Sequence, residues 1–515
     1  MDTHKHILVA LLTFGLLASV LHGSPITSCA QTPYPSICNN YMPSGGVALN
    51  PVIFRDKALS VTRDQAQSAH QLISSMAASS LPDQRTRMAW ADCMELYEDS
   101  LYHLNKVVPA TSNHDDVQTY LSAAIANQET CENGFLALNS PFPQMLMGNF
   151  SMLLSNALAI NKASGATIEI GGGRRLLEAE SAFPSWLSAT YHRQLLQTGA
   201  DMVVAKDGTG DFKTISEALA SSKLSSGTSS GKRFVLYVKQ GVYNENVVVK
   251  RTTHNLALIG DGIGATIVTG DKNVQDGSTT FRSATFAVSG SGFLARDITF
   301  QNTAGPAKHQ AVAFRSGADF SVYYRCQFIG YQDTLYVYAM RQFFRDCEIY
   351  GTVDFIFGDA VAVFQNCNIF VRKPLSYQFN TVTAQGRKDP NENTGIVIQN
   401  SLITAASDLK AVQGSYKTYL GRPWQQYSRT IIIKSVLDSL IAPQGWLPWS
   451  GSFALSTLTY AEYMNTGAGA STSGRVKWPG YHVLTSPLEA GKYTVANFLA
   501  GGHWIPTEVP FTSGL

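Results

Sequence analysis

Two aspartates stand where a pair of carboxylates could do nucleophilic and acid–base chemistry. Asp333 lies in residues 330–336 (Gly-Tyr-Gln-Asp-Thr-Leu-Tyr), and Asp354 lies in residues 351–358 (Gly-Thr-Val-Asp-Phe-Ile-Phe-Gly), 21 positions further on. That interval is one coil of the strand repeat described below, so the two side chains should lie side by side on one face. Neighbouring carboxylates resist ionising together, so one pKa should rise while the other stays low. Either aspartate alone would be interpreted as a turn or cap residue, but the pair favours catalysis.

Neutral amides, an arginine and a tryptophan accompany the pair. Gln332 and Gln310 can donate hydrogen bonds without adding charge, which suits the stabilisation of an oxyanion. Arg422 and Trp424 lie in residues 420–424 (Leu-Gly-Arg-Pro-Trp). An arginine can hold a carboxylate, and a tryptophan can stack on a sugar ring, although plain core packing is the alternative for Trp424.

Two other catalytic schemes are less well supported. His309 could suggest a Ser-His-Asp mechanism, but we expect no Gly-x-Ser-x-Gly nucleophile elbow in this chain. Histidines and cysteines do not cluster at the spacing of metal ligands, and the cysteines are better used in disulfides. We therefore expect neither a metal nor another cofactor.

The periodicity after Asp201 is that of strands. Residues 235–238, 247–249 and 256–259 are apolar or β-branched and are separated by Gly or Asn turns. A rough repeat follows, in which apolar residues flank a polar pair: residues 293–300, 321–328, 342–349, 363–369 and 396–403. Strand-only repeats with a period of about 20–30 residues predict a parallel β-helix.

Seven cysteines leave one thiol unpaired if the others form disulfides in an oxidising compartment. Cys326, Cys347 and Cys367 occupy equivalent positions of the repeat, 21 and 20 residues apart. Equivalent positions on adjacent coils are stacked about 4.8 Å apart, and a disulfide needs Cα atoms about 4.4–6.8 Å apart. Cys326 can therefore pair with Cys347, or Cys347 with Cys367.

The chain before the repeat has the period of helices, from residue 49 to about 160. Trp90, Cys93, Met94 and Tyr97 recur at three- and four-residue spacing, which places them on one helix face. Several such segments joined by short loops predict an all-α helical bundle.

Four further cysteines belong to this part. Cys93 and Cys131 lie on successive helical stretches and can staple them together. Cys29 and Cys38 lie ahead of the bundle, in a Pro-rich segment that is typical of a small stapled hairpin.

The N-terminal residues predict export. Lys5 is followed by an apolar run over residues 7–21 and by small residues, so residues 1–23 are predicted to be a secretory signal peptide. A membrane anchor is the weaker alternative, since a span needs roughly 20 apolar residues. Asn149 begins an Asn-Phe-Ser sequon, which is either glycosylated or unused.

Residues 161–200 are predicted to be a processing linker. They contain the flexible, dibasic Arg174 and Arg175 and a later single Arg193, and an exposed basic segment between domains is a natural cleavage site. An uncut linker is the alternative. Net charge is −4 over residues 1–200 and +6 over residues 201–515, and the second value would suit a polyanionic ligand.

These motifs resemble two plant families. Residues 201–515 resemble the pectin methylesterases, on the strings at residues 237–245, 330–336, 351–358 and 420–424. Residues 25–160 resemble the invertase/pectin methylesterase inhibitors, on residues 91–97 (Ala-Asp-Cys-Met-Glu-Leu-Tyr) and 127–131 (Asn-Gln-Glu-Thr-Cys). The resemblance implies an all-β right-handed parallel β-helix catalytic domain over 201–515, preceded by an all-α helical-bundle pro-region over 24–160.

The resemblance also implies a substrate and a role for each residue. The substrate would be the C6 methyl ester of galacturonate in pectin, with Asp354 as nucleophile and Asp333 as acid and then base. Gln310 and Gln332 would stabilise the oxyanion, and Arg422 would orient Asp354. Sugar-contacting aromatics would be Trp424, Phe357, Tyr336 and Trp446, and Thr285 would join Gln310 in binding substrate.

Three further expectations follow from the resemblance. The family disulfides would be Cys326–Cys347, with Cys367 free, together with Cys29–Cys38 and Cys93–Cys131. The enzyme would be secreted to the plant cell wall, with homogalacturonan, its own pro-region, separate inhibitor proteins and a processing protease as partners. Nucleic acid is not expected as a partner, nor is a membrane after removal of the signal. The family's second cleavage motif is usually dibasic, so the single Arg193 puts its use in doubt and Arg174-Arg175 fits better.

Two rival functions stay open on the sequence. Another β-helix enzyme, a pectate lyase or polygalacturonase, would cut the polymer and would need calcium-binding carboxylates or carboxylates placed about a glycosidic bond. A non-enzymatic inhibitor module whose β-helix only binds pectin would release no methanol.

Overall fold

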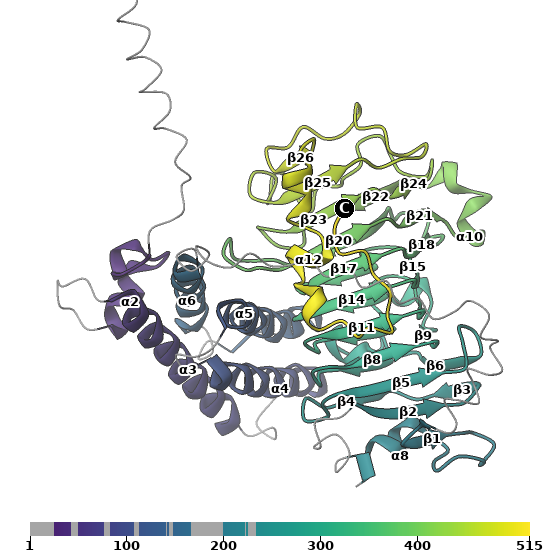
Figure 1. The fold of residues 1–515 in the computed structure, drawn as a ribbon, viewed down its shortest axis with the longest axis horizontal. Coiled ribbons are helices and arrows are strands. Elements are labelled where there is room, and N and C mark those ends of the chain that lie inside the picture. Colours follow the sequence, from purple (N-terminus) through teal and green to yellow (C-terminus); the bar gives the residue numbers. More distant parts are fainter. Residues whose placement is uncertain are drawn as a thin grey trace, which may run out of the picture.

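The computed structural model describes residues 25–42, 50–76, 83–107, 113–140, 142–143, 148–165, 199–221, 223–224 and 233–515. It contains a group of long helices packed beside a β-helix (Figure 1). The predicted signal peptide, and the predicted cleavage sites at Arg174, Arg175 and Arg193, lie outside the described residues.

Four long helices make up the helical domain: α3 (Pro51–Ser75), α4 (Gln84–Val107), α5 (His114–Ala137) and α6 (Phe150–Gly165). The short η1 (Cys29–Gln31) and α2 (Pro35–Tyr41) precede them. Asn50 and Asn113 begin α3 and α5, because their side-chain oxygens accept hydrogen bonds from backbone amides of the first turn. On α4 the predicted face is buried at Cys93 and Tyr97, which confirms the helical bundle.

The strands of the second domain pair only in parallel and form three sheets. One sheet holds β1 (Met202–Val204), β2 (Phe234–Val238), β5 (Leu256–Gly260), β8 (Leu294–Arg296), β11 (Ser321–Tyr324), β14 (Arg341–Arg345), β17 (Val361–Gln365), β20 (Gly395–Gln399), β23 (Arg429–Ile433), β25 (Thr459–Tyr463) and β26 (Tyr481–Val483). A second holds β3 (Gly241–Asn244), β6 (Thr266–Gly270), β9 (Thr299–Asn302), β12 (Gln327–Ile329), β15 (Glu348–Gly351), β18 (Asn368–Val371), β21 (Leu402–Ala405) and β24 (Val436–Leu437). The third, which faces the helices and is called the groove sheet below, holds β4 (Val247–Val249), β7 (Phe286–Val288), β10 (Phe314–Ser316), β13 (Leu335–Val337), β16 (Ile356–Gly358), β19 (Asn380–Gln385) and β22 (Thr418–Gly421).

The central coils each contribute one strand to each sheet, and the terminal coils contribute fewer, so the predicted parallel β-helix is confirmed. The short helices α8 (Ile215–Leu219), α10 (Ser407–Lys410), α11 (Pro487–Gly491) and α12 (Val495–Phe498) lie in or after its connections. Inside the coils, aromatic residues stack in a ladder; the rings of Tyr323 and Phe344, for example, lie 4.5 Å apart, and those of Phe344 and Phe364 lie 4.3 Å apart.

The polar pair of each sequence repeat, such as Asp346 and Cys347, lies at the corner between a strand of the first sheet and a strand of the second. Its first residue has a left-handed backbone at each coil, as at Asp346 (φ 52°), Asn366 (φ 57°) and Asn400 (φ 51°). Asp and Asn tolerate this conformation better than most residues. The next residue points inward and is small, as Cys347, Cys367 and Ser401 show by their burial.

The two helical-domain disulfides are present as predicted, but the one expected in the β-helix is wrong. Cys29–Cys38 and Cys93–Cys131 are bonded, whereas Cys326, Cys347 and Cys367 are free and buried. Stacked side chains at equivalent positions point the same way, so their Cβ atoms stay about one strand spacing apart, near 4.8 Å. A disulfide needs about 3.5–4.5 Å between Cβ atoms.

These thiols instead act as small corner residues. The Cys347 thiol donates to the carbonyl oxygen of Tyr323 at 3.3 Å. One coil further along the same row, the Ser401 hydroxyl accepts from the amide of Cys367 at 3.0 Å. Cysteine and serine are therefore interchangeable in shape along this row.

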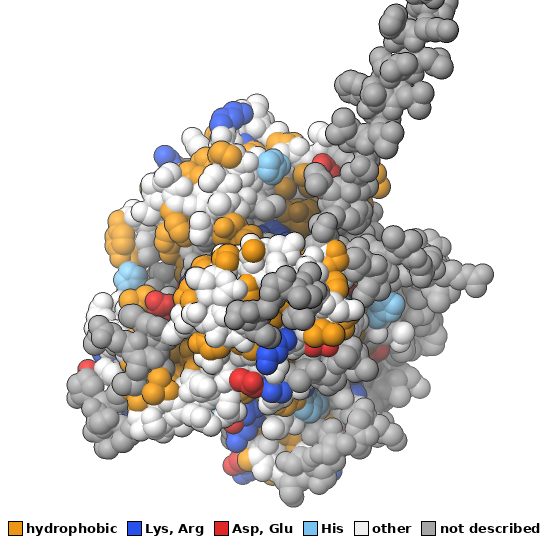
Figure 2. Space-filling view, turned by 90° about the vertical axis from the view of Figure 1, so that its left-hand side faces the viewer, with side chains coloured by type: hydrophobic (Ala, Val, Ile, Leu, Met, Phe, Trp, Pro, Cys, Tyr) orange, Lys and Arg blue, Asp and Glu red, His pale blue; other side chains and the backbone are white. Residues whose placement is uncertain are grey.

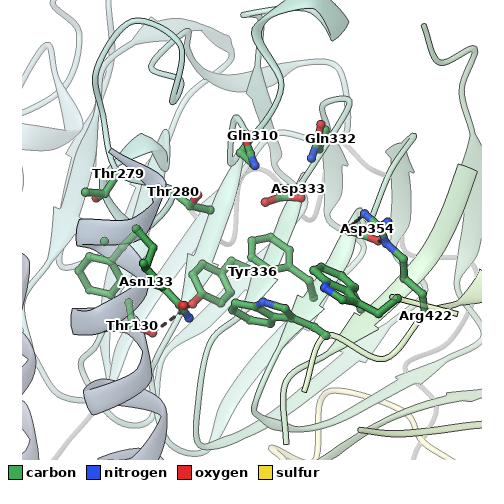
Figure 3. Close-up of a pocket in the computed structure, with 18 residues that line it drawn as sticks. Thr130, Asn133, Thr279, Thr280, Gln310, Gln332, Asp333, Tyr336, Asp354 and Arg422 are labelled. Carbon is green, nitrogen blue, oxygen red and sulfur yellow. Dashed lines mark hydrogen bonds and ion pairs between the residues drawn. The ribbon is translucent and has the colours of Figure 1, made fainter. Parts of the chain in front are cut away.

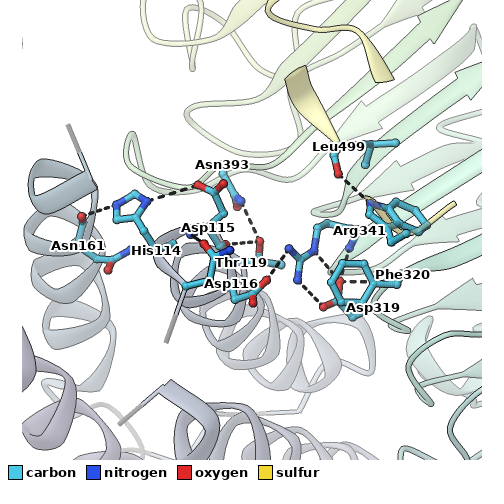
Figure 4. A network of polar contacts seen from close by, with 12 residues as sticks. His114, Asp115, Asp116, Thr119, Asn161, Asp319, Phe320, Arg341, Asn393 and Leu499 are labelled. Carbon is cyan, nitrogen blue, oxygen red and sulfur yellow. Dashed lines mark hydrogen bonds and ion pairs between the residues drawn. The ribbon is translucent and has the colours of Figure 1, made fainter. Parts of the chain in front are cut away.

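The helical domain packs against the groove sheet (Figure 1). Figure 2 shows acidic and basic side chains close together on the face of the molecule where the helices lie. Arg341 of β14 bridges Asp116 of α5 and Asp319 of its own domain, with N–O distances of 2.7 Å to each. Asn393 donates to the hydroxyl of Thr119 on α5 at 2.9 Å (Figure 4). The two domains are therefore in contact through one interface, which contains ion pairs, hydrogen bonds and apolar side chains.

Two features bear on targeting. Asn149, the predicted glycosylation site, lies half-buried just before α6, and its use remains a prediction. Among the described helices, none has the length and hydropathy of a membrane span.

The disulfide pattern can be tested by counting thiols. Because three cysteines are free but buried, the native, unreduced chain should react with no equivalent of a thiol reagent. The same chain unfolded in guanidinium without reductant should react with three. A count of one thiol after unfolding would indicate a third disulfide, such as Cys326–Cys347, and would contradict this structure.

Candidate active site

Asp333 and Asp354 occupy the same corner of neighbouring coils. Each lies two residues before a paired strand position, Leu335 in β13 and Ile356 in β16. Both have left-handed backbones, with φ values of 63° and 52°. This bend aims both side chains outward at the start of the groove sheet, so the predicted pairing is what the structure brings together (Figure 3).

Gly358, at the end of the segment 351–358 that contains Asp354, allows this segment to lie close to the neighbouring coil. Gly358 has a φ of 127°, and a Cβ there would lie 2.1 Å from the carbonyl oxygen of Val337 on the neighbouring coil. No other residue fits without moving β13 or β16, so the strand that follows Asp354 is fixed against the strand that follows Asp333.

The side chain of Asp354 is held by hydrogen bonds from Arg422 and Thr381. The Arg422 guanidinium donates from Nε to Oδ1 at 2.8 Å and from Nη2 to Oδ2 at 2.5 Å. The Thr381 hydroxyl donates to Oδ1 at 2.6 Å and accepts from the Asp354 amide at 2.8 Å. This two-point contact and the hydroxyl fix the rotamer of a charged side chain that is only 5% exposed.

Asp333 has no such partner. It is 7% exposed, and burial, together with the charge of Asp354, raises its pKa well above the usual value, while Arg422 opposes this shift. The pair therefore consists of one carboxyl group bound by an arginine and one whose pKa is raised, as predicted for one member of a close carboxyl pair.

A cavity of about 330 Å³ opens over the two carboxyls. Gln310 and Gln332 line it on one side (Figure 3), and the side-chain oxygen of Gln332 is buried without a hydrogen-bond partner among the described residues. Tyr336 and Phe357, at paired positions of β13 and β16, stack with ring centres 4.2 Å apart and form its floor.

Two tryptophans complete the wall. The Trp424 ring lies edge-on to Phe357, with centres 6.0 Å apart. Trp449, 38% exposed, lines the cavity and packs its ring 4.4 Å from the guanidinium carbon of Arg422. The aromatic surface beside the carboxyls suits the apolar faces of a sugar.

Two predicted substrate contacts do not reach the cavity. Thr285 is fully buried, and its hydroxyl donates to the carbonyl oxygen of Gln301 at 3.0 Å. Trp446 is 1% exposed, stacks on Tyr460 at 4.2 Å and donates to Glu462 at 3.3 Å. Neither side chain lines the cavity.

Sequence reasoning missed Thr381 and Trp449. Thr381 lies 27 residues after Asp354, because a longer loop interrupts the coil length of 20 or 21 residues, so the spacing gave no signal. Trp449 follows Trp446 by three residues, and the two tryptophans could not be told apart without the side-chain directions.

The third side of the cavity belongs to the helical domain. Thr130, Asn133 and Gly134, all on α5, line it (Figure 3), and the Thr130 hydroxyl lies 3.3 Å from that of Tyr336. The Tyr338 hydroxyl donates to the side chain of Asn127 at 2.5 Å. No sequence signal had assigned this helix to the cavity.

The sequence raised a metal site and a Ser-His-Asp mechanism as alternatives, and the described residues bear on both. They contain no group of three or more His, Cys, Asp and Glu residues arranged to hold a metal ion. The expectation that the chain lacks a Gly-x-Ser-x-Gly pattern is wrong in its letters, since residues 227–231 read Gly-Thr-Ser-Ser-Gly. That segment lies outside the described residues, and His309 does not line the cavity.

Known proteins match both parts of the chain. The pectinesterase family model matches residues 201–502, and the plant invertase/pectin methylesterase inhibitor model matches residues 24–160. "Probable pectinesterase/pectinesterase inhibitor 6" of Arabidopsis thaliana is 50% identical, with 96% of this chain and 95% of the relative covered. "Pectinesterase 2" of Citrus sinensis is 51% identical, with 95% and 94% covered.

Solved structures match the β-helix. Pectin methylesterase from carrot is 58% identical with a TM-score of 0.60, over 62% of this chain and 98% of that one. Pectin methylesterase from Aspergillus niger is 32% identical with a TM-score of 0.51, over 59% and 96%. Since the matching family model spans more than half of the sequence and the plant relatives are half identical over nearly all of it, this chain belongs to the pectinesterase family.

Proposed function

We propose that Asp354 and Asp333 carry out the pectin methylesterase reaction in this chain, as nucleophile and as acid/base. The enzyme is a carboxylic ester hydrolase of the pectinesterase family. Its substrate is the methyl ester of galacturonate in homogalacturonan, and its products are methanol and pectate. The observation that carries the assignment is the unequal pair: Asp354 gripped by Arg422 beside Asp333, whose pKa is raised.

The reaction runs in two halves. The Asp354 carboxylate attacks the ester carbonyl, and the side-chain amides of Gln310 and Gln332 donate to the tetrahedral oxyanion. As the acyl–oxygen bond breaks, Asp333 gives its proton to the departing methoxide oxygen, and methanol leaves. The resulting Asp333 carboxylate then takes a proton from water, which attacks the acyl-enzyme and regenerates Asp354. Arg422 keeps Asp354 oriented throughout, and Tyr336, Phe357 and Trp424 support the sugar.

The proposal extends to cellular setting and partners. A signal peptide over residues 1–23 would deliver the chain to the plant cell wall. Cleavage near Arg174-Arg175 or Arg193 would separate the domains, and a processing protease would be a partner. Separate inhibitor proteins are further partners, since the inhibitor-like domain of this chain already fits the groove sheet.

Loss of the nucleophile tests the residue assignment. Asp354→Asn in residues 201–515 keeps the shape and the hydrogen bonds to Arg422 and Thr381 in part, but cannot form the acyl-enzyme. Methanol release from pectin should fall at least about 10³-fold, as expected for removal of a covalent step. Asp271→Asn, at an exposed aspartate that does not line the cavity, is the matched control and should retain activity. Unchanged methanol release by Asp354→Asn would end the assignment, and polymer shortening by the wild type would favour the lyase or hydrolase.

The raised pKa of Asp333 also predicts the pH dependence of stability. A group whose folded-state pKa is raised stabilises the fold fully below its unfolded pKa, about 3.9 for Asp, and this contribution is lost as pH rises through the folded value. Asp333→Asn cannot ionise, so it should be more resistant to urea than wild type at pH 7 and equal to it below about pH 4. Equal stability of Asp333→Asn and wild type across this range would contradict the unequal pair.

We propose further that the helical domain inhibits its own esterase. Helix α5 closes one side of the cavity, and Glu129 of α5 forms an ion pair with Lys388 of the β-helix. A polymer could not reach Asp354 while this helix is in place.

The inhibition can be tested by placing a repulsive charge in the interface between the two domains. Glu129→Lys in the full chain places two cations together, and like charges in an interface cost several kcal/mol. Methanol release should rise at least about tenfold, because each 1.4 kcal/mol changes the docked population tenfold. Glu132→Lys makes the same charge change on the same helix, at a residue without a described ion pair to the β-helix, and should change little. Equal activities of all three chains would contradict inhibition in cis.

A further inference from the structure

Arg315, which lies between the two domains, is buried and forms no ion pair with any acidic residue that the structure describes. Arg315 lies in β10, paired with Tyr336 of β13, and its side chain is on the outer face of the groove sheet. It is 4% exposed. Its guanidinium carbon lies 3.4 Å from the centre of the Phe281 ring, and its Nε has no hydrogen-bond partner among the described residues. A buried guanidinium in this state is costly, and burial lowers its pKa.

Two more arginines continue from it along the same sheet. Arg282 lies in η4 (Phe281–Ser283), just before β7, and Arg251 follows β4 by two residues. The strands β10, β7 and β4 are consecutive in the groove sheet, on the side of β13 away from Asp354. Adjacent strands are about 4.8 Å apart, so the arginines occupy successive coils leading away from the ester site. We call Arg251, Arg282 and Arg315 the arginine track.

Helix α4 meets this track with carboxylates. Asp92, Glu95 and Asp99 recur at helical spacing on one face. Arg282 pairs with Asp92 and, at 2.8 Å, with Glu95. Asp99 pairs with Arg251 at 2.6 Å.

Two of these carboxyl groups, those of Asp92 and Asp99, are buried in a way that disfavours their charged form. Burial raises the pKa of Asp92 to about 6, although Arg282 opposes the shift. Burial likewise raises the pKa of Asp99 to about 6. Glu95 and Asp92 act on Arg315 by charge alone, without an ion pair. The fit of α4 to the track is therefore incomplete at the arginine nearest the cavity.

We propose that the arginine track binds the free carboxylates of de-esterified galacturonate units, and that α4 occupies it by presenting carboxylates of its own. The proposal rests on the esterase function, because the ligand is the enzyme's product or a partly de-esterified substrate. A galacturonate carboxylate carries the same group as Asp or Glu, and a guanidinium can hold it with two parallel hydrogen bonds. Phe281, which stacks on Arg315, also lines the cavity over Asp333. One polymer can therefore lie on the track and in the ester site together.

The experiment uses residues 201–515 and the full chain. The β-helix can be tested alone, since the carrot enzyme is matched over 98% of its length by 62% of this chain and so forms the same fold without a helical domain. The probe is polygalacturonate, which carries no ester, so binding is measured without turnover. Methanol release from esterified pectin by the same preparation reports the esterase function separately.

Arg315→Gln should weaken polygalacturonate binding by residues 201–515 about tenfold, the effect of losing one charged two-point contact. The loss should shrink as salt is raised, because the contact is ionic. Lys434→Gln, which removes an exposed cation on another sheet, should leave the affinity unchanged. Arg282→Gln, in a turn outside the strands, should give a similar loss and replaces Arg315→Gln if that variant does not fold.

The full chain supplies the second arm. Wild-type full chain should bind polygalacturonate at least tenfold more weakly than residues 201–515, because α4 fills the track. Equal binding by the two would overturn the role given to α4. Undiminished binding by both arginine variants, with methanol release intact, would overturn the track while leaving the esterase function in place.

Discussion

Stacking of one coil on the next is the constraint from which the active site follows. Asp333 and Asp354 stand at the same corner of adjacent coils, and the parallel register of β13 with β16 keeps them there. Neither carboxyl could be brought to the other by side-chain choice alone, because a change of one residue in coil length would turn one of them into the core. The glycine at position 358 and the inward aromatic ladder keep the coil length fixed.

Given that register, electrostatics divides the roles. Arg422 and Thr381 hold Asp354 by four hydrogen bonds in all. Asp333 receives only burial and the charge of its neighbour. The pairing of arginine with carboxylate recurs between the two domains, where α4 and α5 bring acidic residues to arginines of the β-helix. The helical domain thus meets the β-helix through the chemistry that a de-esterified polymer would offer.

Much of this could be predicted from the sequence, because it depends on period. The strand repeat predicted the β-helix, and the 21-residue interval within it predicted the carboxyl pair and a raised pKa for one member. The helical period predicted the bundle, while its two disulfides were expected from the placement of the cysteines and from the family resemblance. Side-chain direction was harder: Trp446 and Thr285 face the core, and only the strand register shows it. The Cys326–Cys347 bond failed for the same reason, since stacking distance was known but the parallel direction of the Cβ atoms was not considered.

Contacts between distant segments had no local signal at all. Thr381 is separated from Asp354 by a longer loop, and Asn133 of α5 comes to the cavity from another domain. Arg315 could not be predicted as a binding residue, because the sequence does not show that its side chain is buried with an unpartnered Nε among the described residues.

The central claim is that the two aspartates share one face and that Asp333 is the one that keeps its proton, and neutron diffraction of the crystalline protein at pD 6 tests it most directly. The account predicts a deuteron on the carboxyl of Asp333, none on Asp354, and both side chains at one cavity beside Arg422. A deuteron on Asp354, or both carboxyls bare, would contradict it.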